Sequence, residues 1–220
     1  AQPPIEIVRQ YLDHDGWYDR KKLEYQRIED LMFLTAMGPP GGGRTYITNR
    51  LVRHFNMLTY TDLDDETIKY IFSTILKFTF RKFTDPVLDS VDNLVGSALE
   101  VFETVKAELR PLPNKSFYTF NLRDLSKVFQ GICSAHQKST TEAVHIVRLW
   151  YHENLRVFHD RLTTEEDREF LKNQLKSHFG KFDLTNEQVI DQDRILYGDF
   201  MQGREVEPKN YVQIADLKKL

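Results

Sequence analysis

Arg50 and Arg53 are the residues of this chain whose type and spacing most directly suggest chemistry. They stand in ITNRLVRHF, which follows the glycine-rich run GPPGGGR. A guanidinium group is always charged, and its planar fork of N–H groups matches the oxygens of a phosphate. Residues three apart on a helix share one face. The pattern predicts two arginines presented to an anionic ligand or a neighbour, although a solvated turn with two surface arginines has the same spacing.

Arg123 is a second cation in an unusual position. Asn121 precedes an apolar periodic stretch and Asp124 follows three residues later, which is the arrangement of a helix N-cap and its capping box. Arg123 would then lie in the first helical turn, where the helix dipole disfavours positive charge. We expect it to have an anionic partner. That partner is either a bound ligand or a carboxylate of the chain, such as Asp124.

Metal and thiol chemistry is not predicted. His145, His152 and His159 recur every seven residues in one expected helix, and seven residues rise about 10.5 Å. Metal ligands on one helix need a spacing of about three or four residues. The three imidazoles therefore cannot share an ion, and we interpret them as part of a helix–helix seam or a solvated face. Cys133 lies in an amphipathic stretch and is interpreted as buried filler.

Two apolar runs flank the glycine-rich segment and would position its arginines. Leu31–Met37 has the length of a buried strand, and Met57–Tyr60 indicates a second, with the break at Pro39–Gly43 between them. Two strands do not make a stable parallel sheet, so we expect further strands of that sheet to lie upstream. A helix is expected over residues 3–16, and Trp17–Gln26 is interpreted as a short hairpin or exposed turn.

Only helices are expected after Thr61. Apolar residues repeat there every three or four positions, which is the stripe that a helix buries in a core. Five segments show it, with a minor helix from Thr185: Ile68–Thr79, Asp85–Leu109, Asn121–Cys133, Thr140–Arg161 and Thr163–His178. Thr163 and Glu166 are expected to form a capping box. The segment Ile195–Phe200 is expected to dock a loop onto the body.

The composition bounds the class of protein. With 220 residues, 40% of them hydrophobic and 29% charged, the chain can bury a sizeable core as one domain or two small subdomains. A net charge of −3 does not indicate a nucleic-acid-binding protein. No apolar run approaches the roughly 20 residues of a membrane span. One cysteine excludes internal disulfides and suits a reducing compartment.

Three long strings of the sequence carry a family resemblance. They are AQPPIEIVRQYLDHDGWYDRKKLEYQRIEDLMFLTAMGPPGGGRTYITNRLVRHFN, FNLRDLSKVFQGI and LWYHENLRVFHDRLTTEED. Together they resemble the third AAA+ module of a dynein heavy chain, of the axonemal rather than the cytoplasmic type. In that family the phosphate-binding pattern GxxxxGK[ST] and the acidic strand that holds magnesium precede the QPPIE helix. The resemblance therefore implies a fragment that is expected to be inactive alone, and the missing initiator Met fits that expectation.

The same resemblance implies a fold class and a domain division. The fold would be mostly α. Residues 1–62 would be the C-terminal part, a two-strand remnant, of the AAA+ α/β large subdomain. A helical small (lid) subdomain would occupy residues 63–190, and residues 191–220 would form a weakly structured tail or linker.

The resemblance also implies roles for the arginines. Arg50 and Arg53 match the paired arginines that AAA+ modules present across a ring interface, where they act as arginine fingers on a neighbouring module. Arg123 matches the sensor II arginine, which reaches the nucleotide phosphates of its own module. Gly38 is a departure. The family usually carries a polar residue at this strand end to orient the attacking water, and glycine has no side chain to do so.

The implied function is that of a regulatory AAA+ module in an ATP-dependent, microtubule-based motor of the cilium axoneme, a cytoplasmic and cytoskeletal location. ATP or ADP with Mg is expected in the intact motor, and no cofactor for the fragment alone. The expected partners are neighbouring AAA+ modules and, through the parent motor, the microtubule; no metal site, nucleic acid or membrane partner is predicted. Two alternatives stay open. One is a helical protein-interaction module without a nucleotide role, and the other is a different AAA+ ATPase, against which FNLRDLSKVFQG and WYDRKK argue.

Overall fold

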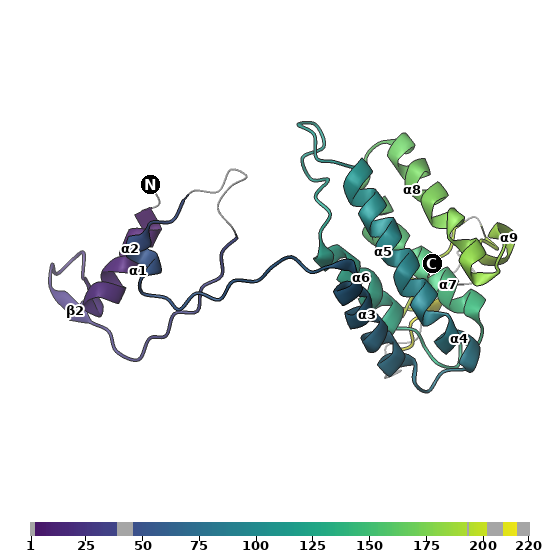
Figure 1. The fold of residues 1–220 in the computed structure, drawn as a ribbon, viewed down its shortest axis with the longest axis horizontal. Coiled ribbons are helices and arrows are strands. Elements are labelled where there is room, and N and C mark those ends of the chain that lie inside the picture. The colour runs from purple at the N-terminus through teal and green to yellow at the C-terminus, as the bar shows by residue number, and fades with distance from the viewer. Residues whose placement is uncertain (1–2, 39–45, 193, 202–208, 215–220) are drawn as a thin grey trace. The chain divides into compact units, whose positions relative to one another are not determined.

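The chain forms two compact units in a computed structural model, Ala1–Asp62 and Leu63–Leu220 (Figure 1). The structure describes residues 3–38, 46–192, 194–201 and 209–214. Each unit is described by itself below. The first holds the glycine-rich segment and its arginines, and the second holds the long helices.

The first unit is built from one helix, a hairpin and one helical turn. Its described elements are α1 (Pro3–His14), β1 (Gly16–Tyr18), β2 (Tyr25–Arg27) and α2 (Asn49–Val52). The two strands pair antiparallel, with Gly16 opposite Arg27, which confirms the predicted hairpin. Tyr11 is buried and packs its ring against Trp17. Gly16 is needed there, because a Cβ at that residue would stand 2.2 Å from the Gln26 carbonyl oxygen.

The two strands predicted beside the glycine-rich segment are not formed. Leu31–Met37 and Met57–Tyr60 contain no strand. Most of their side chains are exposed, Leu34 almost completely at 99%, whereas Phe33 is half-buried against Tyr11. A strand gains its stability from ladder hydrogen bonds to neighbouring strands. Neither segment pairs with any described part of the chain, so the apolar runs stay extended without a sheet. The Pro39–Gly43 break lies outside the described residues.

The second unit is helical. Its elements are α3 (Asp65–Phe80), α4 (Asp85–Asp89), α5 (Val91–Glu108), α6 (Leu122–Cys133), α7 (Ala143–Val157), η1 (His159–Arg161), α8 (Glu165–Ser177), η2 (Phe179–Phe182) and α9 (Asn186–Val189), with the short antiparallel pair β3 (Tyr197–Gly198) and β4 (Val212–Gln213). The predicted class, mostly α, is therefore confirmed. The predicted Asp85 helix is divided at the buried Ser90, whose hydroxyl donates to the Val87 carbonyl at 2.7 Å.

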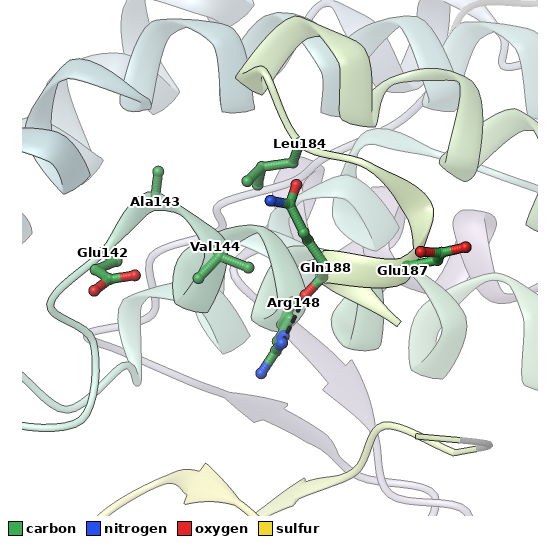
Figure 2. A pocket seen from close by; sticks show the side chains of 7 residues that line it. All are labelled: Glu142, Ala143, Val144, Arg148, Leu184, Glu187 and Gln188. Carbon is green, nitrogen blue, oxygen red and sulfur yellow. Dashed lines mark hydrogen bonds between the residues drawn. The ribbon is translucent and has the colours of Figure 1, made fainter. Parts of the chain in front are cut away.

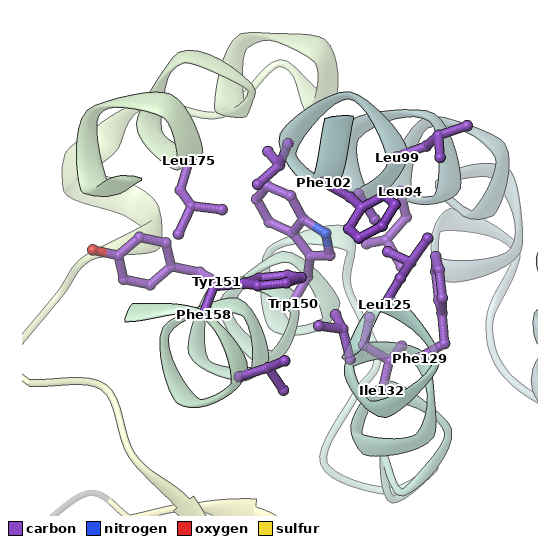
Figure 3. Close-up of a cluster of buried hydrophobic side chains, with 14 of the residues drawn as sticks. Leu94, Leu99, Phe102, Leu125, Phe129, Ile132, Trp150, Tyr151, Phe158 and Leu175 are labelled. Carbon is purple, nitrogen blue, oxygen red and sulfur yellow. The ribbon is translucent and has the colours of Figure 1, made fainter. Parts of the chain in front are cut away.

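The core of the second unit lies between α5, α6 and α7, with α8 closing one side (Figure 3). Trp150 of α7 is fully buried, and Phe102 of α5 and Phe129 of α6 are nearly so. Phe129 stacks on Phe72 of α3 with 4.2 Å between ring centroids. Burying one such side chain stabilises the fold by roughly 1.5–3 kcal/mol. Phe72, Phe102 and Phe129 belong to the predicted stripes, which explains why periodicity located their helices. Trp150 was not among the predicted stripe residues of its helix, although it is fully buried.

The capping predictions hold for two helices and are wrong for a third. Asn121 and Asp124 form the predicted capping box of α6. Thr185, from which a minor helix was expected, is the N-cap of α9 and forms a capping box with Gln188. The Thr163 box is not formed, since Thr164 is the N-cap of α8. Its hydroxyl donates to Asp167 at 2.5 Å. The side chain of Asp167 thus bonds the N-cap of α8, and Asp167 itself is paired with Lys115.

A strap after α9 lies against α7. We call residues 194–201 and 209–214 the C-terminal strap. Ile195 is buried in the core, as expected, whereas Phe200 is exposed. The amide of Ile214 donates to the Leu196 carbonyl at 2.8 Å, and the Ile195 carbonyl lies 3.1 Å from Nδ1 of the buried His152. The strap thus extends the helical body beyond residue 190.

Candidate functional site

Arg50 and Arg53 lie on one helical turn at the surface of the first unit. Thr48 is the extended N-cap of α2, and its carbonyl accepts from Leu51 and Val52 at 3.1 and 3.3 Å. Arg53 is the C-cap and keeps helical dihedral angles. Both arginine side chains are exposed. The predicted placement of both arginines on one short helical segment is therefore formed.

The two arginines differ in their partners. Nη2 of Arg53 lies 2.5 Å from Oδ1 of Asp13, which stands in the last turn of α1. Nε2 of His54 lies 3.0 Å from the same oxygen, and Arg9 pairs with the other carboxylate oxygen. The hydrogen bond from Arg53 is the largest cause holding the pKa of Asp13 below its ordinary value. Arg50 makes no ion pair with any residue that the structure describes.

Arg123 occupies the first turn of α6 with its side chain exposed. Its backbone N–H donates to Oδ1 of Asn121 at 2.9 Å. The alternative partner considered from sequence, Asp124, is instead paired with Arg161 at 3.2 Å and with Lys127 at 3.5 Å. Across the described ranges no carboxylate pairs with the Arg123 guanidinium. Its charge is therefore not neutralised by the described residues, and the predicted Arg123–Asp124 pair is wrong.

A polar cluster that sequence reasoning missed holds the segment before α6. Asp167 of α8 accepts from Lys115 at 2.5 Å and from the Tyr118 hydroxyl at 2.9 Å. Burial pushes the pKa of Asp167 upward, but hydrogen bonds from Lys115, Thr164 and Tyr118 outweigh it and leave that pKa below its ordinary value. The cluster orients the chain entering α6, where Arg123 stands. No spacing pattern links these positions, because their partners are 49 and 52 residues apart.

The histidines and a hollow beside α7 in the second unit do not form a ligand site among the described residues. In the described ranges no group of three or more His, Cys, Asp or Glu could hold a metal ion. A hollow of about 410 Å³ opens beside the start of α7 (Figure 2). Its cation, Arg148, donates to the Gln188 carbonyl at 2.6 Å and pairs with Asp191 at 2.8 Å. Glu142 and Glu187 also line it, so it does not favour an anion.

Comparison with known proteins covers both units. Residues 1–63 match the family model described as the P-loop containing dynein motor region. Residues 72–168 match the dynein heavy chain ATPase lid domain. The whole chain is 44% identical over 234 residues to dynein axonemal heavy chain 1 of Mus musculus. This chain belongs to the axonemal dynein heavy chains. The dynein segment is also 44% identical over 241 residues to dynein axonemal heavy chain 1 of Homo sapiens, and 39% over 224 residues to dynein axonemal heavy chain 6 of Homo sapiens.

The dynein segment spans only a small part of these relatives. All of it is covered in each of the three comparisons, but it corresponds to 6%, 5% and 5% of the relatives' lengths. Arg50 and Arg53 fall within the motor-region match, and Arg123 falls within the lid match. The division into two units, between residues 62 and 63, falls at the end of the motor-region match and before the lid match. Among the described helices of this dynein segment, none is long and apolar enough to cross a membrane.

Proposed function

We propose that this chain belongs to the third AAA+ module of an axonemal dynein heavy chain and serves there as a regulatory module. The parent protein would be an ATP-driven, microtubule-based motor of the cilium axoneme. Its partners would be the neighbouring AAA+ modules of the same heavy chain and, through the whole motor, the microtubule. The 44% identity over the full chain and the order of motor region and lid support this assignment.

The observation that carries a nucleotide role is the unpaired guanidinium of Arg123. An exposed cation in a first helical turn is opposed by the dipole, and no carboxylate of the described chain compensates it. A phosphate group would compensate it. We assign Arg123 to the phosphates of the nucleotide held by its own module, the sensor II role, while its neighbours Asn121 and Asp124 fix the turn from which it projects.

Arg50 and Arg53 act in this proposal on a different module. Both project from one exposed turn, so a nucleotide on a neighbouring module can approach them without disturbing the core. In phosphoryl transfer, charge spreads over the phosphoryl oxygens, and a guanidinium stabilises it. Arg50 and Arg53 are therefore the candidates for the arginine finger of the neighbour's site. Gly38, exposed and without a side chain, argues that hydrolysis in this module itself is weak.

ATP or ADP with Mg would be the cofactor of the intact motor. The residues of this chain fit only part of such a site. They supply guanidinium groups for phosphate oxygens, whereas the GxxxxGK[ST] pattern, whose backbone cradles phosphates, does not occur in the 220 residues. In this chain the arginines thus bind and orient phosphate groups, and the nucleotide supplies the chemistry.

A helical interaction module without a nucleotide role is the second candidate. One observation favours it: α3 exposes apolar side chains along one side, with Tyr70 at 74% and Phe78 at 66% exposure. Such side chains suit a protein contact. This candidate leaves the unpaired Arg123 without a partner, which is why we rank it second.

The deciding experiment compares Arg123→Ala with Lys138→Ala in the intact heavy chain. Both side chains are exposed and charged, and Lys138 is outside the proposed site. A charge-assisted hydrogen bond contributes roughly 1.5–3 kcal/mol, so nucleotide release from this module should be about ten- to a hundredfold faster in Arg123→Ala. Equal release rates in the two variants would reject the nucleotide role and favour the interaction module.

A further inference from the structure

Asp13 makes the two finger candidates unequal. It reaches Arg53 across 40 residues of sequence, and its side chain is only 15% exposed, whereas that of Arg53 is 60% exposed. No corresponding carboxylate meets Arg50 in the described part of the chain. Two arginines that look alike in sequence therefore have different freedom in the folded unit.

We propose that Asp13 is a positioning residue that holds Arg53 against α1, so that Arg50 is the arginine presented to the phosphate of the neighbouring module. This inference rests on the proposed finger role. It adds which arginine contacts the phosphate, and it assigns a role to a carboxylate in a different element.

The charges around Asp13 explain why Arg53 stays where it is. Oδ1 of Asp13 receives Arg53 at 2.5 Å and His54 at 3.0 Å, and Oδ2 receives Arg9. Arg9 is fixed in turn by Glu6 at 2.7 Å. Moving Arg53 to a phosphate would break its ion pair with this mostly buried carboxylate, whose Oδ1 would then keep only His54 as a partner. Presenting Arg50 breaks no ion pair with the described residues.

The Asp13–Arg53 pair also stabilises α2, which is too short to be stable by itself. A helix of one turn does not form stably on its own, because nucleation costs more than one turn of hydrogen bonds returns. The Asp13–Arg53 contact fastens the C-terminal end of α2 to the last turn of α1. Arg50, three residues earlier on the same turn, is thereby given a fixed direction. Asp13 thus acts on the phosphate only through the placement of Arg50.

The test uses the intact heavy chain and measures how fast a fluorescent ATP analogue leaves the neighbouring module. Arg50→Ala should accelerate release about ten- to a hundredfold relative to Arg20→Ala, an exposed arginine of the same unit. Asp13→Asn and Arg53→Ala should each accelerate it by less. Asp13→Glu, which keeps the charge, should restore part of the loss. Asp13→Asn added to Arg50→Ala should change nothing further.

That last comparison separates positioning from general stability, because a purely structural role would add its effect to that of Arg50→Ala. If Arg53→Ala accelerates release as much as Arg50→Ala while Asp13→Asn has no effect, Arg53 contacts the phosphate and the inference fails, although the finger role stands. If Arg50→Ala and Arg53→Ala both behave like Arg20→Ala, the finger role itself fails and the inference with it.

Discussion

Gly131 of α6 lies directly against Glu153 of α7: a Cβ at residue 131 would stand 2.0 Å from the Glu153 carboxylate oxygen Oε2. Glu153 is fully buried. Its Oε2 accepts from Arg156 at 2.6 and 2.9 Å, and its Oε1 accepts from the Tyr211 hydroxyl at 2.7 Å. The absence of a side chain at Gly131 therefore lets two core helices approach around a paired, buried charge.

Gly131→Ala should destabilise the helical unit by about 1–3 kcal/mol, as overpacking of a core does. The matched control is Gly96→Ala in α5, where a Cβ meets nothing within 4 Å. The free energy of unfolding of that control should rise by up to about 1 kcal/mol, because alanine has a higher helix propensity than glycine. Urea unfolding of both variants measures the difference. Equal stability of the two would contradict the close approach.

Tyr211→Phe should loosen the C-terminal strap. It removes a hydrogen bond to a buried carboxylate, which contributes roughly 1.5–3 kcal/mol. Burial is the main reason that the pKa of Tyr211 is raised, so the hydroxyl keeps its proton and remains a donor at neutral pH. Tyr70→Phe, on an exposed ring, is the control and should change little. Hydrogen exchange over residues 209–214 reports the effect, and unchanged protection would show that the Tyr211 contact does not hold the strap.

Arg161→Ala should cost more stability than Lys127→Ala, although both remove a cation from Asp124. Arg161 is 27% exposed, against 53% for Lys127, and it also donates to the Phe117 and Thr119 carbonyls at 3.1 and 3.0 Å. We expect a loss of about 2–4 kcal/mol for the first variant and below about 1 kcal/mol for the second. Thermal or urea unfolding measures the two losses of stability. A larger loss in Lys127→Ala than in Arg161→Ala would contradict the pairing of Asp124 with Arg161.

Mild acid should destabilise the helical unit through His152. Burial lowers the pKa of His152 below its ordinary value of 6.5. Below pH 6.5 the unfolded state therefore binds more protons than the folded state. The contribution of His152 is complete above pH 6.5 and is lost as pH falls through the lowered folded pKa. Burial lowers the pKa of His178 in the same direction.

His152→Asn keeps an N–H near the Ile195 carbonyl but cannot titrate. We expect the fall in unfolding free energy between pH 6.5 and 5 to be shallower in this variant, with the remaining slope coming from His178. The control is His14→Asn, the same substitution at an exposed position of the first unit. A slope equal to that of the unsubstituted chain in His152→Asn would reject the assignment.

The 220-residue chain by itself should not bind ATP tightly. Its arginines can attract phosphate, but no backbone cradle of the GxxxxGK[ST] type occurs in the sequence. Calorimetry with ATP and Mg should give no micromolar binding. Micromolar affinity would mean that the chain holds a nucleotide site of another kind.

Much of the helical unit could be predicted from the sequence because its determinants are local. The stripes that become α3, α5, α6 and α7 repeat within four residues, and the capping boxes of α6 and α9 join residues three apart. Hydrogen bonds and packing over such distances depend little on the rest of the chain. The hairpin after α1 was predictable for the same reason. The strand prediction at Leu31–Met37 was wrong, because a strand needs hydrogen-bonding partners that its own residues cannot supply.

The partners of the charged groups were decided by the tertiary structure alone. Sequence put Asp124 beside Arg123, but the fold brings Arg161 to that carboxylate from η1, and it brings Asp13 to Arg53 across 40 residues. Arginine can pair with any carboxylate in reach, and exposed pairs differ by about 1 kcal/mol or less. Which pair forms therefore depends on which groups the packed helices bring within about 3 Å of each other. The sequence by itself identified Arg50, Arg53 and Arg123 as candidates, and only the folded chain distinguishes the held arginine from the free ones.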